Sequence, residues 1–177
     1  MRQSRHVLCA ALVALLLTGC YHVGSPGSGR KFALARLDID NKTQEAMVGR
    51  QLTAALRERF SVDPATTLAK DKGEPYLVTA VITKIDNLSI ARAEIRDNRS
   101  RDDDSKAYQT VLYRVALYAD LTFTRQGDEK PTLKRSYVGY GDLPQMHDRE
   151  VPLRHACQQA ANSIAAQALD DLAAIRD

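Results

Sequence analysis

The chain has 177 residues, of which 44% are hydrophobic, and its 25 Lys and Arg against 22 Asp and Glu give a formal net charge of +3. The apolar content suffices for a folded core and excludes wholesale disorder. The near balance of charge excludes a protein that mainly coats nucleic acid, and 3 Cys are too few for a disulfide framework. The length fits one ordinary domain with a leader.

The first twenty residues have the pattern of a bacterial lipoprotein signal. Two arginines precede an unbroken apolar run from Val7 to Leu17. This run is too short to span a hydrocarbon layer of ~30 Å, but it suits the central region of a signal peptide. It is followed by Thr18, Gly19 and Cys20, which resembles a lipobox. We therefore predict a lipoprotein signal peptide at residues 1–19; the alternative is an ordinary secretory signal with a chance Cys.

The lipobox resemblance implies that Cys20 carries three acyl chains after cleavage. Each buried methylene contributes ~0.8 kcal/mol to membrane affinity, so three chains anchor the protein essentially permanently. In many Gram-negative bacteria an Asp after the lipidated Cys retains the protein at the inner membrane, whereas here Tyr21 follows. The expected location is therefore the outer membrane, facing the periplasm. Residues 20–30 are expected to be the lipidated Cys and a flexible tether, and residues 31–177 a single periplasmic α+β domain.

The first part of this domain predicts a strand followed by a helix. Lys31–Ile39 has the apolar content of a strand. After a polar stretch that ends at Thr43, apolar residues recur every four positions up to Phe60, which predicts an amphipathic helix. These residues are Val48, Leu52, Leu56 and Phe60. Asn41 with Gln44 fits a capping box for this helix, and Thr43 is the alternative cap.

The middle of the chain predicts a buried strand between two polar segments. Ser61–Glu74 is punctuated by Pro and Gly and indicates a connection, with or without a short edge piece. Tyr76–Ile82 is apolar at most positions, and its strand pattern extends to Ile90 with a change of register. Ala91–Lys106 is almost without apolar content, so we expect an exposed loop or the tip of a hairpin there.

The clearest pattern is the strict alternation of apolar residues from Val111 to Phe123, which predicts a long strand with one face in the core. A turn at Gln126–Pro131 and a further strand at Thr132–Tyr140 complete an antiparallel hairpin. Leu117 and Leu121 belong to the alternating series, so we expect them in the core, facing the helices. The residues expected to end the second strand are Gly139, Gly141 and Pro144.

From Asp148 the apolar period is helical again and continues to Ile175. The Ala-rich composition of this segment favours a long helix with close packing. The predicted element order is therefore β-α-β-β-β-α. Two amphipathic helices and mixed-pattern strands predict an α+β two-layer sandwich, in which a four-stranded mixed sheet carries both helices on one face.

No pattern in the chain points to catalysis, a metal or a cofactor. Cys157 lies in the apolar stripe of the last helix, two residues from His155, and residues so spaced do not share a helix face. A packed thiol is therefore expected rather than a nucleophile. Asp102–Asp104 lacks the Gly and the distant Glu of a calcium-binding EF-hand loop. The sequence thus predicts that the protein is not an enzyme and has no catalytic residue, metal site or cofactor.

Several short motifs resemble the LptE family of lipopolysaccharide-assembly lipoproteins. They are Cys20 with the Tyr-His-Val that follows, a Gly-rich spacer, the strand from Phe32 to Ile39, Asn41-Lys42-Thr43 before the first helix, and an Ala-rich last helix. The predicted element order matches this family as well. The resemblance implies an outer-membrane lipoprotein that plugs an LptD-type β-barrel translocon, assists its assembly and binds lipopolysaccharide. Its expected contacts are that barrel, lipopolysaccharide and, through the acyl chains on Cys20, the membrane, but not nucleic acid.

The charged segment Ala91–Lys106 is open to two interpretations. It is either a solvated hairpin tip with paired charges, or a contact for lipopolysaccharide phosphates or for an acidic barrel lining. The planar fork of Arg suits phosphate oxygens, which favours contact. The Asp triplet at 102–104 argues against contact, since it would repel the same phosphates or capture the Arg side chains. The candidate contact residues are Arg92, Arg96, Arg99 and Arg101.

A second class of function stays open on the sequence alone. The chain also fits an accessory or scaffold lipoprotein of another cell-envelope or secretion complex, with no role in lipopolysaccharide assembly. Identification of the partner separates the two, because only the first should bring down a large lipopolysaccharide-translocon barrel.

We predict that Cys20 is the site of lipidation. Cells fed labelled palmitate should incorporate it into the wild-type protein. Cys20→Ala should abolish the label, because Cys20 is the cysteine that directly follows the apolar run and its small residues. Persistent labelling of the variant would show that the lipobox interpretation is wrong.

Overall fold

The computed structural model describes residues 31–95, 107–145 and 148–175. The strands form one mixed sheet in the order β2-β1-β3-β4-β5. β1 runs parallel to β2 and β3, whereas β4 is antiparallel to β3 and β5. In chain order the elements are β1 (Phe32–Asn41), α2 (Ala46–Val62), β2 (Thr66–Thr67), the 3₁₀ turn η1 (Lys70–Lys72), β3 (Glu74–Ile95), β4 (Ala107–Arg125), β5 (Leu133–Pro144) and α3 (Glu150–Ala174).

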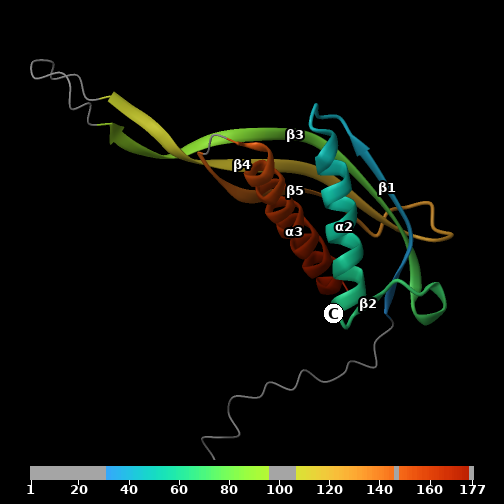
Figure 1. The fold of residues 1–177 in the computed structure, drawn as a ribbon. Coiled ribbons are helices and arrows are strands. Elements are labelled where there is room, and N and C mark those ends of the chain that lie inside the picture. Colours follow the sequence, from blue (N-terminus) through green and yellow to red (C-terminus); the bar gives the residue numbers. More distant parts are fainter. Residues whose placement is uncertain (1–30, 96–106, 146–147, 176–177) are drawn as a thin grey trace, which may run out of the picture.

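Both helices cover the same face of a curled sheet (Figure 1). This confirms an α+β fold with two helices, but among the described residues the sheet has five strands rather than the predicted four. The additional strand, β2, consists of Thr66 and Thr67, which pair with Phe32 and Ala33. It lies at the edge of the sheet, within the segment Ser61–Glu74 that was predicted as a connection with or without a short edge piece. Two residues are too few for an apolar period to appear, so the predicted strand count left this piece out.

The core lies between the helices and the sheet. Leu117 and Leu121 of β4 are fully buried there, which confirms their predicted position. The four-residue apolar period of α2 is also confirmed, since Val48, Leu52, Leu56 and Phe60 are all buried. In α3 the buried stripe extends to Leu172, whereas Ile175, the last residue of the predicted stripe, is 50% exposed. Burial of these apolar faces supplies the main stabilisation of the fold.

The start of α2 differs from the prediction. The helix begins at Ala46, and Glu45 precedes it without a side-chain cap. The Asn41 side chain instead accepts hydrogen bonds from the Thr43 N–H and hydroxyl at 3.0 and 2.8 Å and donates one to the carbonyl of Glu45 at 2.9 Å. Asn41 and Thr43 therefore stabilise the turn between β1 and α2, a local arrangement that competes with a capping box for the same side chains.

The glycines of β5 do not end the strand, contrary to the prediction. β5 continues through Gly139 and Gly141 to Pro144. A Cβ atom at Gly139 would overlap the carbonyl oxygen of Ala160, and one at Gly141 would overlap that of Ala156. The two glycines thus let the backbone of α3 lie directly on β5, a role that glycine can have in a strand interior.

Side chains of α3 also occupy part of the free edge of β5. The amide of Gln167 donates to the carbonyl of Val138 at 3.1 Å, and the N–H of Asp142 donates to the amide oxygen of Gln159 at 3.2 Å. These bonds satisfy backbone groups that would otherwise stay open to another strand.

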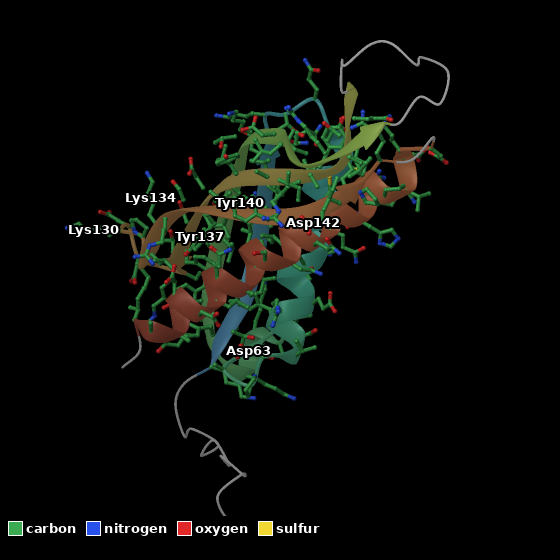
Figure 2. The ribbon with its side chains drawn as sticks, turned by 90° about the vertical axis from the view of Figure 1, so that its left-hand side faces the viewer. Asp63, Lys130, Lys134, Tyr137, Tyr140 and Asp142 are labelled. Carbon is green, nitrogen blue, oxygen red and sulfur yellow. The ribbon has the colours of Figure 1, made fainter. Side chains whose placement is uncertain are left out.

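A second set of contacts joins β5 to the last turns of α3. The Tyr137 hydroxyl donates to Asp171 at 3.0 Å, and Arg135 lies 2.7 Å from the other oxygen of that carboxylate. The hydrogen bond from Arg135 holds the pKa of Asp171 below its ordinary value, so this carboxylate stays ionised at neutral pH. Burial, followed by the bond to Asp171, raises the pKa of Tyr137. Tyr137 lies along β5 together with Tyr140 and Asp142 (Figure 2).

The glycine contacts predict opposite effects for two Gly→Ala substitutions. Gly141→Ala should lower the free energy of unfolding by about 1–3 kcal/mol, because the new methyl group forces α3 away from β5. Gly49→Ala in α2 is the matched control: a Cβ there has only ordinary contact with Asn41, at 3.7 Å. It should stabilise the protein by about 0.5–1 kcal/mol, since Gly is unfavourable inside a helix. Urea unfolding monitored by circular dichroism measures both; a Gly141→Ala variant as stable as the wild type would contradict the close contact.

Candidate functional site

The predicted site residues lie mostly outside the described residues. Cys20, Arg96, Arg99 and Arg101 all fall there. Arg92 lies within β3 and is exposed. The structure therefore does not show whether the four arginines come together, and the interpretation of the charged segment as a contact site stays a prediction.

Part of the segment predicted as an exposed loop or the tip of a hairpin is strand. β3 continues to Ile95 and β4 starts at Ala107, so Ala91–Ile95 belongs to the antiparallel ladder of a hairpin rather than to a loop. The pairing runs to Ile95 opposite Ala107 and is interrupted by register shifts near Ala91. Apolar periodicity could not reveal this, because exposed two-stranded pairing does not require an apolar face.

Residues 88–95 of β3 and 107–112 of β4 form what we call the projecting hairpin, which extends away from the helices (Figure 1). The last pair between β4 and β5 is Leu112 with Pro144, so the base of the hairpin, where Leu88 lies opposite Arg114, is still three-stranded. From Arg92 and Thr110 outward the described residues form only two strands. Ser89 and Thr110 are joined across the hairpin by a hydroxyl–hydroxyl hydrogen bond of 3.0 Å. An isolated two-stranded ribbon is marginally stable in water, so this part of the molecule has little support of its own.

The projecting hairpin also exposes apolar side chains. Leu88, Ile90 and Val111 are 44%, 41% and 43% exposed, and Arg92 follows them along β3. These exposed aliphatic side chains make the projecting hairpin a candidate contact surface. The chemistry of the hairpin is therefore mixed, with aliphatic contact area next to a guanidinium.

The uncovered face of the sheet is the second candidate surface. Side chains alternate between the two faces of a strand, so the neighbours of the buried Leu117 and Val115 in β4 point away from the helices. The ladder places these outward residues in three adjacent rows, Lys84–Tyr118–Val138, Asp86–Ala116–Tyr140 and Leu88–Arg114–Asp142.

The charges on this face are paired with one another. Arg114 and Asp142 form two hydrogen bonds of 2.8 and 3.3 Å across the strands, and Lys84 lies 2.6 Å from Asp86. The hydrogen bond from Arg114 lowers the pKa of Asp142, and the hydrogen bond to Asp86 raises the pKa of Lys84. Lys84, Arg114 and Asp142 are therefore ionised at neutral pH.

Two tyrosines accompany these ion pairs. The guanidinium of Arg114 lies 5.9 Å from the ring centroid of Tyr140, and the ammonium of Lys84 lies 5.6 Å from that of Tyr118. Both distances fall within the range of cation–π attraction. The uncovered face thus offers aromatic area and charges that are already neutralised, which suits a protein or hydrated surface better than a free anion.

Sequence reasoning missed these pairs. The ladder pairs Phe123 with Leu133, and this register places Arg114 opposite Asp142, whereas strands that meet at the predicted turn Gln126–Pro131 would place Arg114 opposite Leu143. Lys84 and Asp86 share a face because they are two residues apart in one strand. The contacts with Tyr118 and Tyr140 depend on side-chain rotamers, which no pattern in the sequence indicates.

The remaining groups with chemical potential have structural surroundings. Cys157 is fully buried, as predicted, and burial raises the pKa of its thiol to about 11, so it stays protonated at neutral pH. Within the described part of the chain, no three His, Cys, Asp or Glu side chains gather to hold a metal. None of the described helices is long and apolar enough to cross a membrane. That the protein is not an enzyme stays a prediction.

Comparison with known proteins gives only distant similarities. No model of a known family matches the chain, and no curated protein matches it significantly. Among solved structures, a minor lipoprotein from Acinetobacter baumannii is 9% identical with a TM-score of 0.46, covering 80% of this chain and 94% of its own. Rare lipoprotein B from Shewanella oneidensis is 10% identical with a TM-score of 0.41, covering 80% and 99%. A hypothetical protein from Chlamydia trachomatis is 6% identical with a TM-score of 0.48, covering 81% and 96%. At these values the similarities assign neither a family nor a function.

Proposed function

We propose that the protein is a lipid-anchored outer-membrane lipoprotein that assists lipopolysaccharide assembly. In this proposal it is the plug and assembly partner of an LptD-type β-barrel translocon and contacts lipopolysaccharide directly. The lipobox at Cys20 and the motifs shared with the LptE family support it. The fold is consistent with it, since the β-α-β-β-β-α order is present apart from the short β2.

The observation that carries the proposal is the position of the projecting hairpin relative to the start of the domain. The carbonyl of Lys31 accepts a hydrogen bond from the N–H of Glu74 at 2.6 Å, so the domain begins beside the first residue of β3. β3 then runs for 22 residues to Ile95. At ~3.3 Å per residue the strand has a contour length of about 70 Å. A chain anchored near Lys31 can therefore extend the hairpin far from the anchor, which an insertion into a barrel lumen requires.

The exposed surfaces are compatible with such a lumen. The interior of an outer-membrane barrel is polar, and the uncovered sheet face presents paired charges, hydroxyls and tyrosines. On the projecting hairpin, Arg92 follows aliphatic side chains in β3, a combination that suits phosphate groups attached to acyl chains. Enclosure in a barrel would also cover the ribbon that the rest of the domain leaves bare.

Purification from native membranes tests this function. Solubilised in mild detergent with an affinity tag, the wild-type protein should bring down a large outer-membrane barrel in a stable complex, because the anchor and the hairpin both hold it there. The partner is identified by mass spectrometry. Recovery as a free monomer would contradict the proposal, and recovery with a different envelope or secretion complex would support the accessory or scaffold role instead.

The contribution of the four arginines is tested by replacing Arg92, Arg96, Arg99 and Arg101 with Gln together. We expect lipopolysaccharide affinity to fall at an unchanged melting temperature, because loss of the guanidinium groups removes bidentate contacts to phosphate. A charge-matched control replaces four exposed cations elsewhere, Arg50, Arg57, Lys130 and Lys134, with Gln. If the first variant binds lipopolysaccharide as tightly as the wild type, the charged segment is a solvated hairpin tip and not a contact. Equal losses of affinity in both variants would indicate non-specific electrostatic attraction.

A further inference from the structure

The end of the domain from which the tether departs exposes aliphatic side chains. Val62, in the last turn of α2, is 67% exposed, and Leu68, just after β2, is 46% exposed. Ile175, at the end of α3, is 50% exposed. The end of α2, β2 and the end of α3 lie at the same end of the molecule in Figures 1 and 2. We call this end, with Val62, Leu68 and Ile175, the tether pole.

Hydrogen bonds fix the start of the described chain at this pole. The N–H of Phe32 donates to the carbonyl of Ala65 at 2.9 Å. The Thr66 hydroxyl donates to the carbonyl of Phe60 at 3.1 Å, which ties β2 to the last turn of α2. Val62 and Leu68 therefore lie only a few residues from Ala65 and Thr66, whose hydrogen bonds hold the chain where the tether begins.

Exposed basic side chains lie on neighbouring segments, just before β1 and in η1. Lys31, Lys70 and Lys72 are exposed at this end. Two of the nearby carboxylates are already engaged, since Asp63 accepts the N–H of Ala65 at 2.7 Å and Glu74 lies 3.7 Å from Arg125. Aliphatic side chains bordered by lysines are typical of surfaces that lie in the headgroup region of a bilayer, where the lysine stems reach outward to phosphates.

We infer that the tether pole is a bilayer-contacting surface, in which Val62, Leu68 and Ile175 enter the interfacial region of the phospholipid leaflet that holds the anchor. The inference rests on the lipid anchor proposed at Cys20 and is independent of the barrel partner. Ten residues lie between Cys20 and Lys31, so the two are eleven Cα-to-Cα steps apart, which limits the pole to about 36–40 Å of extended chain from the bilayer. So short a tether keeps the pole at a high effective concentration next to the lipid.

The contact is tested with the full-length lipidated protein in vesicles of phosphatidylethanolamine and phosphatidylglycerol. Cysteine variants Val62→Cys and Leu68→Cys are labelled with an environment-sensitive fluorophore, and brominated lipids are used as quenchers. Labelling is selective, because Cys20 is expected to be acylated and the buried Cys157 has a thiol pKa of about 11. Val151→Cys is the matched control: Val151 is 53% exposed in the first turns of α3, away from the pole.

The expected result is blue-shifted emission and at least about twofold stronger quenching at positions 62 and 68 than at 151, as expected for probes in the interface. Equal quenching at all three positions, or none on vesicle-bound protein, would overturn the inference. Protein that does not stay with the vesicles would overturn the anchor and this inference together. If purification yields no barrel while positions 62 and 68 are quenched, the proposed function fails and the membrane contact stands.

Discussion

The antiparallel ladder between β3 and β4 is longer than the elements that could cover it, and the rest of the structure follows from this. β3 has 22 residues and β4 has 19, against 10 in β1 and 12 in β5. Where all the layers overlap, the ladder supplies the buried side chains that α2 and α3 cover. Beyond Leu112 it has no third strand, and the apolar side chains of the projecting hairpin stay exposed. A molecule that encloses this ribbon would bury apolar area without disturbing the core, which makes the hairpin a natural place for a partner.

In the other half of the domain, by contrast, the contact between α3 and β5 closes the surface. Gly139 and Gly141 bring the backbones together, and the side chains of Gln159 and Gln167 occupy backbone groups on the edge of the strand. This half is closed by its own packing, whereas the hairpin and the uncovered sheet face are open. The features that could recognise another molecule are consequently on outer surfaces.

The sequence predicted the parts of this fold that depend on a long apolar period. The alternation through Leu117 and Leu121 and the four-residue repeat of α2 both identify buried faces, because burial requires that spacing. It indicated β2 only as a short edge piece within a connection, and it could not predict the continuation of β5 through its glycines, which depends on the approach of α3. The ion pair of Arg114 with Asp142 depends on a hairpin register that the predicted turn alone does not give. Exposure at the tether pole could not be predicted, since only the fold brings residues 62, 68 and 175 to one end of the molecule.

Photocrosslinking in living cells tests most directly the claim that the projecting hairpin enters a barrel. A photoreactive amino acid is placed at Ile90 or Val111, and the same residue at Lys72, near the tether pole, is the control. The account predicts adducts with one large outer-membrane barrel from both hairpin positions, stronger than from position 72. Absence of such adducts at both hairpin positions, in protein that is lipidated and reaches the outer membrane, would contradict it.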